Sequence, residues 1–161
     1  MSFKFRPNQG IGLVEVLIVV AIIGLALASL AGLGNYSLRL QGQLKKNVAA
    51  TFLASEALEA TRAIKDGNWN TLLTYLNETP LHPAKNGSST AWSLINGAET
   101  IDSFQRQVVI GIVRRDSNFN IVSEGGTVDD DTKKITATVS WTENNQTQRV
   151  ILTSHLTNWK P

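Results

Sequence analysis

One carboxylate, Glu15, stands at the start of a long apolar stretch. No charged residue occurs from Val16 to Leu38, and the first charge after Glu15 is Arg39. As a helix, this span would rise about 34 Å, enough to cross the hydrocarbon core of a bilayer. Burial of an unpaired carboxylate in such a setting is costly. Glu15 must therefore be protonated, paired with a cation or kept at the membrane surface.

The residues that precede this stretch form a short basic leader. They include Lys4 and Arg6, contain no acidic residue and end in Gly10. Such a leader fits the rule that positive charge stays on the cytoplasmic side of a membrane. A secretory signal is disfavoured, because the apolar run follows the glycine and no small-x-small site closes it. On spacing alone, a plain signal anchor with Glu15 at the membrane surface is an equal alternative.

The segment from Gly10 to Gly24, GIGLVEVLIVVAIIG, resembles the amino-terminal signature of type IV pilins and pseudopilins. In that family the prepilin peptidase, a membrane aspartyl protease, cuts after the glycine and methylates the new terminal amine. The resemblance implies cleavage between Gly10 and Ile11, N-methylation of Ile11, and a role for Glu15 in the assembly register of subunits. The chain departs from the family at Ile11 and Gly12, where phenylalanine and then threonine or serine are usual.

The same resemblance implies a structural subunit, predicted to be a minor pilin of a type IV pilus (a fimbrium) or a related filament, and not an enzyme. Its expected partners are prepilin peptidase, other pilin subunits and inner-membrane lipid. The precursor would cross the inner membrane once, with its leader cytoplasmic and its globular domain outside, before joining an extracellular pilus or a periplasmic pseudopilus. Two alternatives stay open: a pseudopilin of a type II secretion or DNA-uptake machine, and a membrane-anchored binding or enzymatic domain.

Histidine chemistry is sparse in this chain. His82 and His155 are the only histidines. Glu78 lies four residues before His82, but Pro80 and Pro83 prevent the two from sharing a helix face, which disfavours a metal site there.

Two acidic stretches are candidates for calcium. Asp129 to Asp131 could supply ligands, but a solvated loop is favoured because too few other oxygen ligands lie nearby. The stretch Asp116 to Asn120 begins like an EF-hand, yet it lacks glycine at the sixth place and glutamate at the twelfth. Four tryptophans are predicted to be core or interface anchors: Trp69, Trp92, Trp141 and Trp159. No catalytic set, metal site or cofactor site is predicted.

The composition excludes further functional classes. The chain has 15 basic and 13 acidic residues, so loss of Lys4 and Arg6 would leave 13 against 13 and no net charge. No basic patch argues for contact with nucleic acid. The absence of cysteine excludes disulfides, thiolate metal sites and thiol catalysis.

The helix is predicted to continue beyond the apolar stretch with an amphipathic pattern. One row at a spacing of four is followed by a second, and both are predicted to face a globular domain. Glycine at position 67 is the expected stop. One helix of about 55 residues is therefore predicted from near Ile11 to near Lys65. The first row is Leu40, Leu44, Val48 and Phe52, and the second is Ala54, Ala57, Leu58, Thr61 and Ile64.

The remainder predicts an antiparallel sheet of about four strands and an α+β fold. The expected domains are a leader (1–10), an apolar helix (11–38) and a globular domain (39–161). The expected elements after the helix are a short helix or turn at 69–76, a loop at 80–89, a hairpin of 91–95 with 98–101, a strand at 104–112 with Ile112 facing the core, a short strand at 121–122, a polar loop at 124–131, a strand at 134–141 and a last strand at 148–159.

Overall fold

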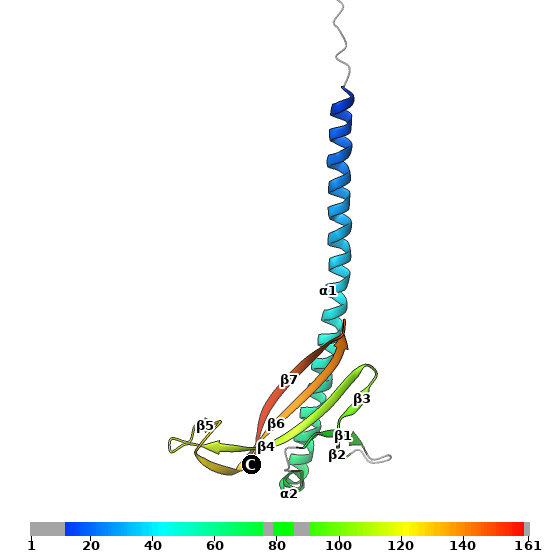
Figure 1. Ribbon diagram of the computed structural model, residues 1–161. Helices are drawn as coiled ribbons and strands as arrows, with labels where there is room; N and C mark the ends of the chain where they lie inside the picture. The colour runs from blue at the N-terminus through cyan, green and yellow to red at the C-terminus, as the bar shows by residue number, and fades with distance from the viewer. Residues whose placement is uncertain (1–11, 76–78, 86–90, 160–161) are drawn as a thin grey trace, which may run out of the picture. The chain divides into compact units, whose positions relative to one another are not determined.

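The computed structural model describes residues 12–75, 79–85 and 91–159. The fold is α+β, as predicted: a long helix α1 (Leu13–Gly67) is followed by a short helix α2 (Trp69–Leu73) and an antiparallel sheet (Figure 1). By its internal contacts the chain divides into a unit up to Lys45 and a unit from Lys46. Each unit is described by itself below.

The sheet of the second unit is built around the long strand β4. Its order is β2-β1-β4-β6-β7, and β3 and β5 also pair with β4. Seven strands therefore replace the predicted four or so, because several short pairings were not visible in the sequence. The strands are β1 (Leu81–Lys85), β2 (Trp92–Asn96), β3 (Glu99–Ile101), β4 (Phe104–Arg115), β5 (Ile121–Val122), β6 (Thr127–Glu143) and β7 (Gln146–Thr157).

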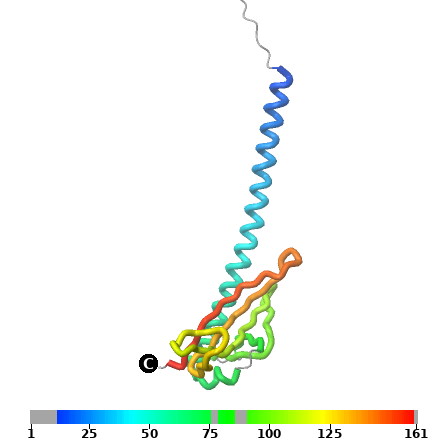
Figure 2. The backbone as a smooth tube through the Cα atoms, turned by 60° about the vertical axis from the view of Figure 1, so that its left-hand side comes forward, coloured from blue at the N-terminus to red at the C-terminus, as the bar shows by residue number. Residues whose placement is uncertain are grey.

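The core lies between one face of the sheet and the last turns of α1, over which the strands run (Figure 2). The helix contributes mainly small side chains, Ala50, Ala54 and Ala57, all fully buried. Alanine lets the sheet approach the helix closely, and buried contacts of this kind define the core. Buried Thr61 donates its hydroxyl to the carbonyl of Ala57 at 2.8 Å, so it leaves no unpaired polar group. The facing sheet residues include Leu81, Leu94, Val108, Ile110, Ile135, Ala137, Val139 and Trp141.

The first predicted helix row does not reach this core, and that prediction was wrong. Val48 and Phe52 are 54% and 71% exposed, and the two earlier members of the row, Leu40 and Leu44, are exposed as well. Val48 lies nine residues before Ala57, which places it about 180° away around the helix. The second row is confirmed, with Leu58 partly buried.

The predicted loop at 80–89 and hairpin at 91–101 were also wrong. Residues 81–85 form β1, which pairs with β2 throughout but with β4 only at Leu81. Pro83 is therefore tolerated, because its missing N–H lies beyond the β4 ladder. The strands β2 and β3 do not pair with each other, since β3 pairs with β4. Residues 86–89 of the predicted loop lie outside the described part of the chain.

A bulge explains why the alternation in β4 fails at its end. The register against β6 shifts between Ile112 and Val113. Ile112 is 43% exposed, so the prediction that it faces the core was wrong, and Val113, at 2%, is buried instead. Asp130, Asp131 and Thr132 of β6 have no partner in β4, so the pairing skips three residues of β6, and the inward and outward positions of β4 change beyond Ile112. The predicted turn at Asn144 and Asn145 is confirmed, with φ of 49° and 59° as a tight hairpin requires.

The sequence accounts for the end of α1 and the start of α2. Gly67 is the last residue of α1, and Asn68 caps α2 by accepting a hydrogen bond from the backbone N–H of Asn70 at 2.9 Å. Trp69 and Leu72 of α2 are buried, as expected. Leu76, the last residue of the predicted short helix or turn, lies outside the described residues.

Candidate functional site

The apolar half of α1 is the most unusual surface of the chain. Every described residue from 12 to 45 is exposed, although most of them up to 38 are apolar. Leu13 and Leu25, for example, are 76% and 71% exposed. In the described part of the chain, α1 is the one helix long and apolar enough to cross a membrane. Its apolar surface is covered by nothing within the first unit, so it is available to lipid or to other helices.

Glu15 lies in the first turn of this helix. Its backbone N–H donates to the carbonyl of Gly12 at 2.9 Å. A carboxylate in a first turn interacts favourably with the helix dipole. The Glu15 side chain is exposed and forms no ion pair with a residue that the structure describes. Gly10 and Ile11, the predicted cleavage and methylation positions, lie outside the described residues.

The two histidines have different surroundings. Nδ1 of His82 lies 3.0 Å from the carbonyl oxygen of Gly97, so the ring is used in a local contact. His155 is exposed on β7. Glu78 lies outside the described residues. Within the described ranges, no three histidine or acidic side chains gather as a metal ion would require.

The carboxylate of Asp116 organises a turn. It accepts hydrogen bonds from the backbone N–H groups of Asn118 and Asn120, each at 2.8 Å, and from the side-chain amide of Asn120 at 3.1 Å. These bonds, the Asn120 side chain first, lower the pKa of Asp116 below its usual range. The residues that resemble the start of an EF-hand are thus an Asx-type turn between β4 and β5.

The acidic stretch Asp129 to Asp131 lies in β6 and not in the predicted loop. Asp129 accepts a 2.6 Å hydrogen bond from Nε of Arg115, and this contact most strongly lowers the pKa of Asp129. Asp131 accepts from the side-chain amide of Asn158 at 3.1 Å. Asp130 is almost fully exposed and lies 3.9 Å from the ammonium of Lys133. The three carboxylates therefore point to three different partners.

Sequence reasoning missed a buried arginine. Arg106 is 4% exposed near the start of β4. Its guanidinium donates at 2.7 Å to Glu56 of α1 and at 2.7 and 3.1 Å to Glu99 of β3. The sequence did contain a signal for it. Arg106 lies two residues from Phe104 and two from Val108, so strand alternation places it on the inward face, where an unpaired charge would be costly. The group therefore joins α1 to the sheet.

The tryptophans divide between core and surface. Trp69 and Trp141 are buried, and Trp141 meets Phe104 edge to face with ring centroids 5.7 Å apart. Trp92 is half-buried, with the ammonium of Lys85 4.4 Å from its ring centre. Trp159 is 72% exposed.

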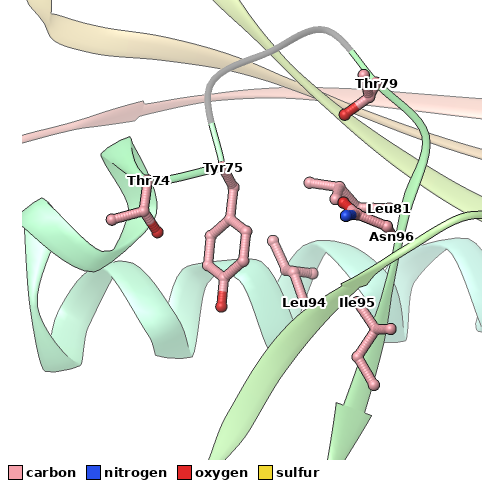
Figure 3. Close-up of a pocket in the computed structure, with 7 residues that line it drawn as sticks. All are labelled: Thr74, Tyr75, Thr79, Leu81, Leu94, Ile95 and Asn96. Atoms are coloured by element: carbon pink, nitrogen blue, oxygen red, sulfur yellow. The ribbon is translucent and has the colours of Figure 1, made fainter.

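A hollow of about 410 Å³ lies between the end of α2 and β2. Figure 3 shows Tyr75, which lies just after α2, and Leu94 and Ile95 from β2 around it. The described side chains that line it include no carboxylate, imidazole or ammonium group. They supply neither a general base nor a metal ligand of the usual kind.

Comparison with known proteins places the leader in a family. A model of the prokaryotic N-terminal methylation motif matches residues 5–31, a range that includes Gly10, Ile11 and Glu15. No curated protein and no solved structure matches the chain. The chain therefore has the leader of a type IV pilin-like or pseudopilin-like prepilin. This motif, together with the apolar helix that follows it, supports a membrane-anchored precursor and points to a structural subunit.

Proposed function

We propose that the chain is a structural subunit, a minor pilin, of a type IV pilus or related filament. It is stored in the inner membrane as a prepilin with its leader in the cytoplasm. Prepilin peptidase cuts it between Gly10 and Ile11 and methylates the Ile11 amine. The subunit then assembles with other pilin subunits through its apolar helix.

One observation carries this proposal: the methylation motif at 5–31 overlaps the start of a helix whose apolar side chains are all exposed from Leu13 to Leu44. Lipid can cover such a surface in the precursor, and neighbouring helices can cover it in a filament. The row from Leu40 to Phe52 continues an exposed apolar surface along α1. Filament neighbours that pack on α1 would cover that row as well.

A pseudopilin of a type II secretion or DNA-uptake machine is the second candidate. The matched motif favours it equally, because the signature between Gly10 and Gly24 resembles both groups. The two functions differ in the location of the filament: a pilus extends outside the cell, and a pseudopilus does not. Microscopy of surface filaments that carry a tagged copy separates them: a pilin labels fibres outside the cell, and a pseudopilin labels none.

Processing is the direct test of the proposal. Glycine before the cleaved bond gives the protease access to the backbone, because it has no side chain. We expect the mature chain to begin with methylated Ile11, as measured by mass spectrometry of its amino-terminal peptide. Gly10→Val should leave the full-length precursor in the membrane.

A substitution in the leader but away from the bond is the matched control. Asn8→Ala should be processed like the native chain. Normal cleavage of Gly10→Val, or a native mature chain that begins elsewhere, would contradict the pilin interpretation.

A further inference from the structure

A second hollow, of about 560 Å³, opens on the outer face of the sheet where β4, β5, β6 and β7 come together. This volume falls within the range of small-molecule sites, roughly 300–1,000 Å³. Its polar side chains include Arg114 of β4, Lys134 of β6 and His155 of β7. The other lining residues are Ile112, Val113, Ile121, Val122, Ser123 and Thr153.

The strand register places two of these basic groups directly side by side. Lys134 and His155 are cross-strand partners between β6 and β7. On the other side of Lys134, its partner in β4 is Gly111. Glycine adds no side chain, so nothing at that position fills the space beside the Lys134 ammonium. Arg114 follows the register shift between β4 and β6 and lines the same hollow.

Among the residues that the structure describes, no acidic side chain lines the hollow. Asp129 pairs with Arg115, and Asp130 is the acid nearest to Lys133. Glu124, which follows the lining residue Ser123, is exposed and is not itself part of the lining. Among the described residues, neither Arg114 nor Lys134 forms an ion pair. Two positive charges, on Arg114 and Lys134, thus line one space that no carboxylate of the described residues lines. Like charges held together repel each other, and a bound anion would relieve that repulsion.

Part of the lining is apolar. Ile112 and Ile121 are 43% and 49% exposed, so each keeps part of its side chain in solvent. A free inorganic anion would leave that surface wet. An anion carried on a short aliphatic body would cover the isoleucines while its charged group meets Arg114 and Lys134.

We propose that this hollow binds small organic anions, with a carboxylate or phosphate group on a short apolar body. Arg114 and Lys134 hold the charged group, His155 adds to the field, and Ile112 and Ile121 contact the apolar part. A nucleic acid is the poorer fit, because phosphate polymers are held by a longer track of cations, typically about 6–10 contacts. The proposal does not rest on assembly into a filament.

The experiment uses the full chain in neutral maltoside micelles, with its isoleucine and valine methyl groups labelled for NMR. The probe is 4-methylpentanoate, and its neutral amide, 4-methylpentanamide, controls for apolar partitioning. Saturable shifts should appear at the methyl groups of Ile112, Ile121 and Val122, and not at Ile151, which is exposed outside the hollow. The amide should bind at least ten-fold more weakly. Isopentyl phosphate in place of the carboxylate shows which anionic group binds more tightly.

Substitutions test whether Arg114 and Lys134 bind the anionic group. Arg114→Gln with Lys134→Gln should weaken 4-methylpentanoate binding at least ten-fold, and Arg149→Gln, an exposed cation elsewhere on β7, should leave it unchanged. Equal binding of acid and amide, or no effect of the double substitution, would overturn the proposal. A short DNA duplex that shifts the same methyl groups at lower concentration than the small anions would overturn it as well, in favour of nucleic acid.

Discussion

At the scale of the residue, the contact between Arg115 and Asp129 should make stability depend on pH. The pKa of Asp129 lies below the ordinary aspartate value of 3.8, chiefly because Arg115 donates to it. This stabilisation is therefore complete above that ordinary value and is lost as the pH falls through the lower, folded-state pKa. Urea unfolding followed by tryptophan fluorescence reports on the second unit alone, which holds all four tryptophans.

The test is Asp129→Asn, which should lose about 1 kcal/mol of unfolding free energy at pH 7 and almost nothing at the acid end. Asp130→Asn is the matched control, because that carboxylate is exposed and 3.9 Å from its nearest cation. If both variants follow the same pH curve as the native chain, the Arg115 contact does not contribute.

At the scale of the element, Arg106 is expected to join α1 to the sheet. Its guanidinium is buried, but the side chains of Glu56 and Glu99 are 50% and 30% exposed. Both carboxylates would stay solvated after Arg106→Ala, so the loss should be smaller than for a fully buried pair. We expect about 2 kcal/mol of unfolding free energy, measured by urea unfolding of the full chain in maltoside micelles.

Arg62 provides the control for that measurement. It pairs with Glu59 one turn away on the same helix, and both side chains are about half exposed or more. Arg62→Ala should cost less than about 0.5 kcal/mol. Equal losses of unfolding free energy for the two substitutions would mean that the Arg106 network contributes no more to stability than a surface ion pair.

Elements with a single strong pattern were predictable, and those set by distant pairing were not. The apolar run after Glu15 and the alternation from Ile135 to Trp141 gave the helix and the central strand, because each pattern is local. The register shift after Ile112 depends on the pairing with β6, and β2 finds its partner in β1, on the far side of the intervening segment. The exposed row at Val48 failed for a related reason: helical periodicity shows that a face is apolar and not what covers it.

The candidate sites divide in the same way. The leader and Glu15 were visible because their signal is contiguous, and the motif match covers the same residues. Arg114, Lys134 and His155 come from three strands, so only the folded sheet brings them to one hollow. In the sequence analysis, His155 carried no functional prediction.

At the scale of the whole molecule, the chain combines an uncovered apolar helix with a folded unit that has its own core. Apolar helices alone slide along one another without a strong preference, because their contacts are non-directional. A directed polar contact would be needed to fix the axial position of an incoming subunit. Glu15 is the one acidic residue between Gly12 and Arg39 that could provide it.

In an assembled filament, Glu15 would be surrounded by apolar helices, where an unpaired carboxylate is costly. The nearest cation that the mature sequence would offer is the Ile11 amine, and the family resemblance implies the amine of an adjacent subunit. We therefore expect Glu15→Leu to be processed and stable in the membrane but several-fold depleted in sheared filaments relative to its membrane pool. Glu124→Gln, a change at an exposed acid of the second unit, should be incorporated normally. Native-level incorporation of Glu15→Leu would return Glu15 to the role of a surface charge on an anchor, because a register contact cannot be removed without misplacing the subunit.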